Sequence, residues 1–300
     1  MDIPNWFRAV PRNNIQTLRS NDGRRRPINT FSRDAICYLQ RKISNISFSI
    51  KYSLTIGALK VKKNEIYRDI KTVPPIIIRA DGRNFKESLK RLNFEKPYDI
   101  SFERGMVTAA RRLILESGLS PEWVFTFSDE FNILFKELPF EGRLEKLDSV
   151  VPSFLSSALT IALKIDTPLA FDARVIPMHP ENMIEYLQYR QAEAWRNHMQ
   201  SYGFYSLVKE GVNEKDAAAK MHGMKYEDIH EMMWRRGVNL GETPGWQRKG
   251  VLVYKKKVEK EGYDPVKKEK VIAIRTELDE LWDPPIFNSK EGIDFLKEII

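Results

Sequence analysis

Two apolar stretches of the chain each carry acids where a strand is expected to end. PPIIIRADGRNF (residues 74–85) contains Asp81 after its β-branched run, and VFTFSDEFNILF (residues 124–135) contains Asp129 and Glu130 at its centre. A single acid at a strand end usually only closes a turn. Two close carboxylates, however, repel each other unless they are protonated or bridged by cations. Two Mg²⁺ ions about 4 Å apart form such a bridge and support phosphoryl transfer.

The order of elements decides whether the two acids meet. Apolar patterns predict strands and helices: strands at 73–81, 122–127, 130–136 and 170–178, and helices at 99–118 and 143–164. This β-α-β-β-α-β order predicts an α+β, ferredoxin-like antiparallel sheet with strand order 4-1-3-2. That topology places Asp81 beside the Ser128–Asp129 turn, as in a polymerase-type palm. Gly82 allows the backbone to turn sharply there and offer its carbonyl to a metal.

The second half of the chain reads as helices followed by a β-hairpin. The expected helices span 180–211, 213–224 and 225–237, and the hairpin pairs 245–258 with 267–277. We therefore divide the chain into a basic extension (1–62), a palm catalytic domain (63–180) and a helical and β-hairpin C-terminal region (181–300). The sequence leaves open whether this last region packs on the palm or forms a separate lobe.

The net charge of +8 is concentrated at the N-terminus. Residues 1–62 contain twelve Lys and Arg against three Asp, so the remaining residues are close to neutral. The segment reads as a disordered basic arm that binds phosphates, as an organelle transit peptide, or as a stretch that is not native. The third reading follows from the absence of methionine between Met1 and Met106, which allows a non-AUG start near Val61.

Composition excludes several other classes of site. The single cysteine, Cys37, permits no internal disulfide, and four scattered histidines form no zinc motif. No run of 18 apolar residues is present, so we expect no membrane span. A cytoplasmic protein is the simplest interpretation.

The motifs of this chain resemble, in order and spacing, those of the tRNA-His guanylyltransferase family of 3′-to-5′ RNA polymerases. They are RADGRNF (79–85), FEKPYD (94–99), FSDEFNILF (127–135), FDARV (171–175), YLQYRQAEA (186–194) and WQRKGVLVY (246–254). The resemblance covers about residues 63–254. It implies a palm with two Mg²⁺ ions that adds a nucleotide, usually G, to the 5′ end of a tRNA after activation by a nucleoside triphosphate. It also implies GTP and ATP as substrates and a homotetramer in which tRNA spans subunits.

The resemblance assigns roles to individual residues. Asp81 and Asp129 are expected to be the catalytic metal carboxylates, with the Gly82 carbonyl as a further metal ligand. The expected nucleotide site comprises Asp81, Gly82, Arg83, Asn84, Phe85, Lys86, Ser128 and Asp129, with Lys96 and Asp99 near the triphosphate. Phosphate or RNA contacts are expected from Arg79, Arg143, Lys146, Arg190 and Asn239. Glu130 is expected to support the ligands without binding metal, because neighbouring strand residues point to opposite faces.

Two departures from the family pattern concern substrate choice. The position of a histidine in the eukaryotic enzymes is Trp195 here, and that of a lysine is Ile229. Template-directed repair of tRNA 5′ ends is therefore an alternative to action on tRNA-His. Trp195, Tyr202 and Tyr205 with Arg190 and Arg196 could form an RNA-contacting face, although aromatics at this helical spacing more often belong to a core.

Two further functional classes remain open. One is a palm enzyme, such as a nucleotide cyclase, that uses a nucleoside triphosphate without RNA. The other is a non-catalytic RNA-binding module that uses its sheet as an RRM does. The intact strand acids and the Asp81–Gly82 turn count against the second class.

Overall fold

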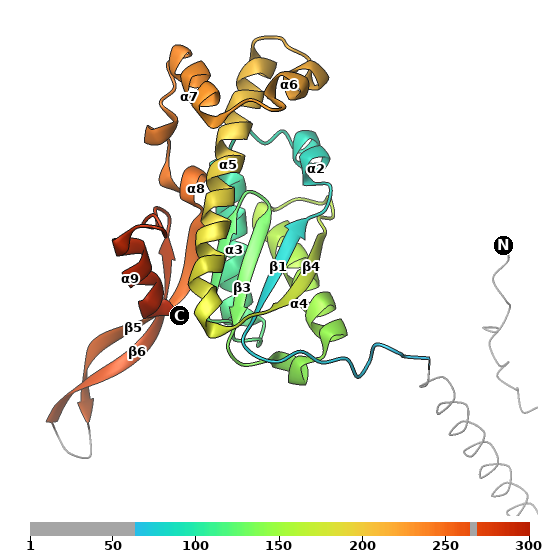
Figure 1. The fold of residues 1–300 in the computed structure, drawn as a ribbon. Coiled ribbons are helices and arrows are strands. Elements are labelled where there is room, and N and C mark those ends of the chain that lie inside the picture. The colour runs from blue at the N-terminus through green and yellow to red at the C-terminus, as the bar shows by residue number, and fades with distance from the viewer. Residues whose placement is uncertain (1–63, 265–268) are drawn as a thin grey trace, which may run out of the picture. The chain divides into compact units, whose positions relative to one another are not determined.

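The computed structural model describes residues 64–264 and 269–300 (Figure 1). The predicted extension over residues 1–62 lies outside these ranges. The strands are β1 (Ile76–Gly82), β2 (Trp123–Phe127), β3 (Glu130–Phe135), β4 (Phe171–Pro177), β5 (Val251–Asp264) and β6 (Glu269–Leu281). The helices are α2 (Phe85–Arg91), α3 (Ile100–Glu116), α4 (Leu144–Leu163), α5 (Met183–Lys209), α6 (Glu214–Met221), α7 (Tyr226–Arg235), α8 (Gly245–Lys249) and α9 (Lys290–Ile299).

The strands form one antiparallel sheet in the order β4-β1-β3-β2-β5-β6. The first four confirm the predicted ferredoxin-like order 4-1-3-2. β5 then pairs with β2, where Trp123 lies opposite Tyr254, so the C-terminal hairpin extends the same sheet. Residues Ile66–Ile300 accordingly form one compact unit.

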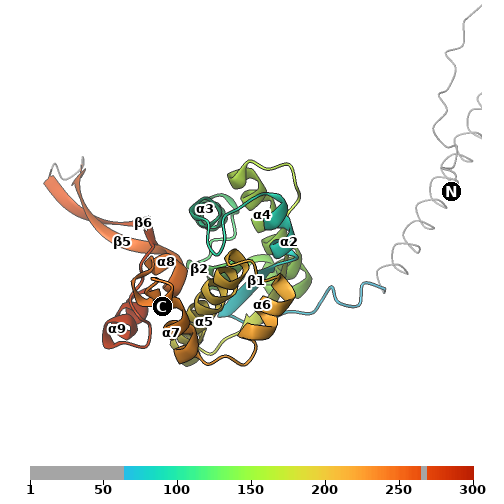
Figure 2. The ribbon, with the colours of Figure 1, turned by 90° about the horizontal axis from the view of Figure 1, so that it is seen from above.

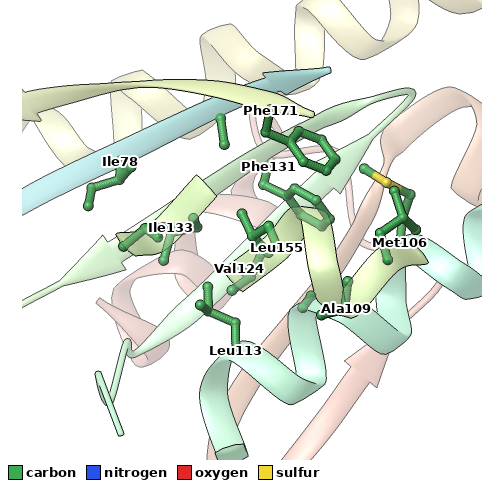
Figure 3. Close-up of a cluster of buried hydrophobic side chains, with 14 of the residues drawn as sticks. Ile78, Met106, Ala109, Leu113, Val124, Phe131, Ile133, Leu155 and Phe171 are labelled. Atoms are coloured by element: carbon green, nitrogen blue, oxygen red, sulfur yellow. The ribbon is translucent and has the colours of Figure 1, made fainter. Parts of the chain in front are cut away.

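Helices cover both faces of the sheet (Figure 2). On one face, α3 and α4 pack on the even-numbered side chains of β1, and Figure 3 shows this core around Ile78, Phe131 and Leu155. On the other face, α5 and α9 pack on the odd-numbered side chains, beginning with Ile77. This alternation follows from the two-residue period of a strand. The outer half of α5 joins α6 and α7 in a third apolar cluster, which includes Met199, Met221, Ile229 and Met233.

Helix α4 is long and apolar enough to cross a membrane by length and composition alone. Leu147, Val151, Leu155 and Leu159 on this helix are buried in the core against the sheet. This is the arrangement of a core helix, and the described residues contain no clear membrane span.

The local starts and stops follow ordinary capping chemistry. The Asp99 carboxylate accepts hydrogen bonds from the amides of Ser101 and Phe102 and so begins α3. Asn213 caps α6 in the same way. Helices α2 and α9 were not predicted from the sequence. Helix α8 occupies the first residues of the strand predicted over 245–258. Gly250, at φ 75°, separates α8 from β5, and a side chain there would collide with the Phe125 ring at 2.7 Å.

Candidate active site

The tips of β1 and β3 meet at one end of the sheet. Asp81 lies directly opposite Glu130 in the strand register. The Gly82 amide donates a hydrogen bond of 2.9 Å to the Asp129 carbonyl, and Ser128, at φ 53°, forms the tight turn between β2 and β3. The structure therefore brings Asp81, Gly82, Ser128 and Asp129 together, as the topology predicted.

Gly82 leaves room for the Asp129 carboxylate. A Cβ atom at this position would lie 2.8 Å from Asp129 Oδ2 and 2.7 Å from Cγ of the Phe85 ring. Such contacts are shorter than real Cβ atoms make, so a side chain at residue 82 would displace the acid or the ring. The glycine is required here by close approach, because its φ is not among the positive values.

The two carboxylates interact electrostatically. Burial raises the pKa of the Asp129 carboxyl, and the negative charge of Asp81 raises it further. The Ser128 hydroxyl donates to Asp129 Oδ1 at 3.1 Å and, with the charge of Lys96, opposes that rise. The surrounding protein groups therefore do not fully offset the loss of solvation of the ionised Asp129 carboxylate. A bound cation would provide that compensation.

Arginines compensate Asp81 from two strands. Arg79 Nε lies 3.3 Å and Arg174 Nη2 lies 3.2 Å from Asp81 Oδ2. Arg174 also approaches Asp172 at 3.7 Å. This arrangement follows from two mirrored tripeptides, Arg-Ala-Asp in β1 and Asp-Ala-Arg in β4, which pair residue by residue in antiparallel register.

Glu130 is bound from the α5 side of the sheet. Arg190 donates to both of its oxygens, at 2.9 Å from Nε and 2.5 Å from Nη2, and the Asn132 amide donates to Oε1 at 2.7 Å. The Tyr186 hydroxyl in turn donates to Asn132 at 2.6 Å. Burial raises the pKa of Glu130 against the opposing charge of Arg190.

This network gives a different reason for expecting that Glu130 does not bind the metal. Residues directly opposite each other in antiparallel strands share a face, so Glu130 shares the face of Asp81 and is not excluded by its direction. Its bonds to Arg190 and Asn132 occupy both oxygens instead. A supporting role for Glu130 stays a prediction that this geometry favours.

The donors at the strand tips fit a hard divalent cation. No group of three or more His, Cys, Asp or Glu side chains suited to a metal occurs among the described residues. Asp81, Asp129 and the Gly82 carbonyl nevertheless provide only oxygen ligands, which is the donor set that Mg²⁺ prefers. Burial raises the pKa of the Asp129 carboxyl, and a bound cation would favour its ionised form.

The predicted nucleotide residues lie around this point, but not all of them face solvent. Arg83, Asn84 and Lys86 are exposed, and Asn84 adopts a left-handed conformation, φ 57°, that begins α2. Phe85 is only 2% exposed and packs on Phe171 at 4.9 Å between ring centres. The Phe85 side chain therefore supports the loop from within the core.

Two further predicted contacts come from the loop between α2 and α3. Lys96 is half-buried, and burial lowers the pKa of its amine while the charge of Asp129 raises it. This coupling places the amine in the electrostatic field of the carboxylate site. Asp99 is occupied as the cap of α3 and also accepts from the Glu95 amide at 2.9 Å. Its oxygens hold the loop that presents Lys96.

The remaining predicted phosphate contacts lie elsewhere. Arg190 is 6% exposed and bonded to Glu130, which differs from the surface role predicted for it. Arg143 and Lys71 pair as an isolated β-bridge next to the start of α4, and Lys146 lies in the first turn of that helix. Arg143 and Lys146 are both at the end of the sheet opposite Asp81. Asn239 accepts from the Gly241 amide at 3.0 Å and begins a short helix, Leu240–Glu242.

The predicted RNA-contacting face on α5 is divided by the fold. Trp195 stacks on His198 at 5.2 Å, and the Tyr202 hydroxyl donates to Gln247 at 2.7 Å. The Tyr205 ring makes a separate contact: the amine of Lys96 lies 5.8 Å from its centroid. Trp195 and Tyr202 are partly buried against the third apolar cluster, which is the core alternative that the spacing allowed.

Sequence reasoning missed Arg174 and Asp172 as neighbours of Asp81. The signal was available in the mirrored Arg-Ala-Asp and Asp-Ala-Arg tripeptides, because the predicted order makes β1 and β4 adjacent. Glu103 on α3 was also not predicted as a site residue, because it belongs to no recognisable motif.

Two family models match most of the chain. The model described as tRNAHis guanylyltransferase matches residues 58–179, and the model described as Thg1 C terminal domain matches residues 181–280. A probable tRNA(His) guanylyltransferase of Drosophila melanogaster is 32% identical over 200 residues, which cover 61% of this chain and 68% of that protein. The tRNA(His) guanylyltransferase of Schizosaccharomyces pombe is 27% identical and covers 64% and 78% of the two chains.

Solved structures show the same fold. The tRNA(His) guanylyltransferase of Saccharomyces cerevisiae superposes with a TM-score of 0.55 at 23% identity, covering 69% of this chain and 93% of that one. A bacterial tRNA(His) guanylyltransferase-like protein in complex with ATP gives a TM-score of 0.61 at 19% identity, covering 82% and 98%. The GTP complex of a bacterial protein of the same description gives 0.59 at 20% identity, with the same coverage.

Proposed function

The chain belongs to the tRNA(His) guanylyltransferase family, and we propose that it joins a GTP-derived G to the 5′ end of a tRNA. It is a nucleotidyltransferase, and enzymes of this kind generally depend on metal ions. The observation that carries the proposal is the convergence of Asp81 and Asp129 across Gly82 at neighbouring strand tips.

The proposed metal is Mg²⁺, as two ions held by Asp81, Asp129 and the Gly82 carbonyl. When bound, these ions would stabilise charge on the attacking and leaving oxygens of a phosphoryl transfer. The side chains of the chain itself then bind the triphosphate. Arg83 and Lys86 are exposed beside the strand tip, and the Lys96 amine lies in the field of Asp129.

The proposed reaction has two steps. The 5′-phosphate of the tRNA first attacks the α-phosphorus of ATP and releases pyrophosphate, which leaves an adenylylated 5′ end. The 3′-hydroxyl of GTP then attacks the 5′ phosphorus, forms the 3′–5′ phosphodiester bond and releases AMP. Both steps place anionic oxygens at one site, where basic side chains and metal would neutralise the charge.

A matched set of variants tests the carboxylate assignment. Asp81→Asn and Asp129→Asn keep the size of the side chain, and we expect each to reduce transfer of labelled GTP to a 5′-monophosphorylated tRNA by about 100-fold or more. Asp294→Asn, which changes an exposed acid on α9, is the control and should retain activity. Transfer at the wild-type rate by either site variant would overturn the assignment.

Metal dependence is tested in the same assay. Removal of divalent ions with EDTA should abolish transfer, and readdition of Mg²⁺ should restore it. Release of pyrophosphate from ATP or GTP alone, without RNA, would instead favour a cyclase-like enzyme. RNA binding without any turnover would favour the non-catalytic module.

Template-directed repair of 5′ ends is the second candidate. It is supported by the two positions that depart from the family pattern: Trp195 stacks on His198 at 5.2 Å, and Ile229 is fully buried. Neither offers the polar group that the eukaryotic pattern has there. Full-length tRNA-His and 5′-truncated tRNAs, whose 3′ strand serves as template, distinguish the two roles through their relative kcat/KM.

We extend the proposal to a homotetramer in the cytoplasm. The distal parts of β5 and β6 pair with each other, and Ile272 and Ile274 there are each 70% exposed. A two-stranded hairpin with exposed apolar residues is marginal alone, which supports a contact with other copies of the chain. Sedimentation equilibrium should give four chains, and Ile272→Lys should reduce that number; a monomeric wild type would contradict this extension.

A further inference from the structure

A small cavity adjoins the carboxylate site on the side of α3. Its volume is about 70 Å³, and it lies between the loop that follows α2, the start of α3, and helices α5 and α8. Residues around it include Lys96, Tyr98, Glu103, Ser128, Ser201 and Trp246. Ser128 also belongs to the β2–β3 turn, so the cavity and the carboxylate site share a wall.

Glu103 is an unexplained acid in this cavity. Its side chain comes from α3 and is only 3% exposed, and its Oε1 has no hydrogen-bond partner among the described residues. Burial raises the pKa of this carboxyl to about 8. An unsatisfied buried polar group destabilises a fold, whereas a leucine would suit this part of the core. A carboxyl at this position therefore points to a ligand that supplies hydrogen bonds.

Four aromatic side chains also line the cavity. Phe94 and Phe102 meet edge to face at 5.7 Å, and Tyr98 and Trp246 do so at 5.8 Å. Aromatic walls combined with a few polar groups are typical of a small-molecule site. A flat, apolar ring with a polar edge has the matching chemistry. Ser128 and Glu95 are exposed and line the same cavity, which marks its outer end.

The size of the cavity limits what enters it. A volume of about 70 Å³ corresponds to roughly two water molecules, so at most the hydrogen-bonding edge of a base would fit, with the ribose outside. Lys96 lines the same cavity and is coupled electrostatically to Asp129. A nucleotide with its base edge at Glu103 would thus extend its phosphates toward the carboxylate site.

We propose that Glu103 binds the N1/N6 edge of adenine and selects ATP in this cavity, an inference that rests on the proposed function. A neutral carboxyl offers one O–H donor and one acceptor oxygen. Adenine presents the complement, an acceptor at N1 and a donor at N6. Guanine presents adjacent N–H donors at N1 and N2 and requires an ionised carboxylate with two acceptors. The raised pKa of Glu103 favours the neutral form at pH 7.

The other titratable groups around the cavity do not provide this complementarity. The Asp99 oxygens already accept from the amides of Glu95, Ser101 and Phe102. Burial raises the pKa of the Tyr98 hydroxyl, which therefore stays neutral. Lys96 offers only donors, and its amine also titrates with a lowered pKa. For this reason the test compares variants at one pH.

The experiment measures binding of ATP and of GTP separately to the full chain by calorimetry, with Mg²⁺ and without tRNA. Glu103→Gln keeps a donor and an acceptor, so its affinity for ATP should remain within about threefold of wild type. Glu103→Leu keeps the volume but loses both groups, so its affinity for ATP should fall by about tenfold while that for GTP changes little. Glu116→Gln, which changes an exposed acid at the other end of α3, is the matched control and should leave both affinities unchanged.

A further ligand isolates the hydrogen bond from N6. Purine riboside triphosphate retains N1 but lacks the N6 amine, so it should bind wild type more weakly than ATP and bind Glu103→Leu as weakly as ATP does. An unchanged ratio of ATP to GTP affinity in Glu103→Leu would overturn the proposal and leave the cavity to buried water. A selective loss of GTP affinity in Glu103→Gln would overturn it in favour of guanine.

The outcome is distinguishable from failure of the proposed function. Binding is measured without RNA, and Asp81→Asn and Asp129→Asn report on transfer. If transfer proves independent of those acids while Glu103→Leu still loses ATP, the proposed reaction fails and the base site stands. If transfer requires Asp81 and Asp129 but the affinity for ATP is unchanged in Glu103→Leu, only the proposed base site is wrong.

Discussion

Replacing Arg190 with methionine should strongly destabilise the fold. Arg190 is 6% and Glu130 is 7% exposed, and the guanidinium donates to both carboxylate oxygens. Methionine fills much of the same volume without charge, so it leaves a buried carboxyl of raised pKa without its charged partner. Breaking a buried pair in this way costs about 3–5 kcal/mol, mostly because the remaining charge is uncompensated.

The size of the effect can be converted into a melting temperature. For a unit of 150–250 residues, each kcal/mol changes Tm by about 2–4 °C, so Arg190→Met should lower Tm by roughly 6–20 °C. The double variant Arg190→Met/Glu130→Leu removes both charges and should recover most of the loss, because apolar replacement of a buried pair is often neutral.

The loss should also depend on pH. Without Arg190, the pKa of Glu130 in the folded state rises further above its unfolded value. An acid of raised pKa favours folding when protonated, so it lowers the free energy of unfolding as pH rises through the unfolded pKa toward the folded one. The deficit of Arg190→Met should therefore be largest near neutral pH and shrink toward pH 4.5.

Urea unfolding followed by circular dichroism measures these free energies. Arg235→Met is the control, since Arg235 pairs with Glu231 at 2.8 Å on the exposed face of α7, and an exposed pair contributes less than about 1 kcal/mol. A loss below 1 kcal/mol in Arg190→Met, or a double variant as unstable as the single one, would refute the argument.

Three other variants follow from the structure. Gly82→Ala places a Cβ 2.8 Å from Asp129 Oδ2, so urea unfolding should show a loss of about 1–3 kcal/mol, with transfer reduced more than the folded fraction explains. Glu103→Leu removes a carboxyl whose pKa is raised to about 8; wild type should lose up to about 1.4 kcal/mol of stability per unit as pH rises from 5 to 8 because of this group, and the variant should lack that slope. Burial lowers the pKa of His198 to about 3, so the unfolded state takes up a proton below pH 6.5 and wild type should lose stability faster than His198→Leu as pH falls from 6 to 4.

The catalytic half of the fold was predictable because its signals are local. Short apolar runs mark four strands, and the order of elements then leaves one familiar antiparallel topology. The convergence of Asp81 and Asp129 follows from that topology. By contrast, α2 has only seven residues after a left-handed Asn84, which is too short for a helical period to be recognised.

The long-range ion pairs could not be read in the same way. Arg is mostly exposed in proteins, so the sequence gives no sign that Arg190 is buried or that Glu130 is its partner until their elements are placed together. The sequence accordingly predicts a phosphate or RNA contact for Arg190, whereas the fold buries it against β3. Glu103 could not be identified from the sequence either, because it reads as one polar residue of an amphipathic helix. Only the cavity beside it indicates a role.

Helix α5 connects the two regions that differ in their agreement with the family pattern. Arg190 fixes this helix to Glu130, next to Asp129, the proposed metal ligand. Trp195, five residues later, already packs against the apolar cluster that contains fully buried Ile229. Trp195 also stacks on His198, so both altered positions contribute to the packing of the helical region. The buried ion pair between Arg190 and Glu130 lies on the other side of this boundary and is independent of the two altered positions in sequence.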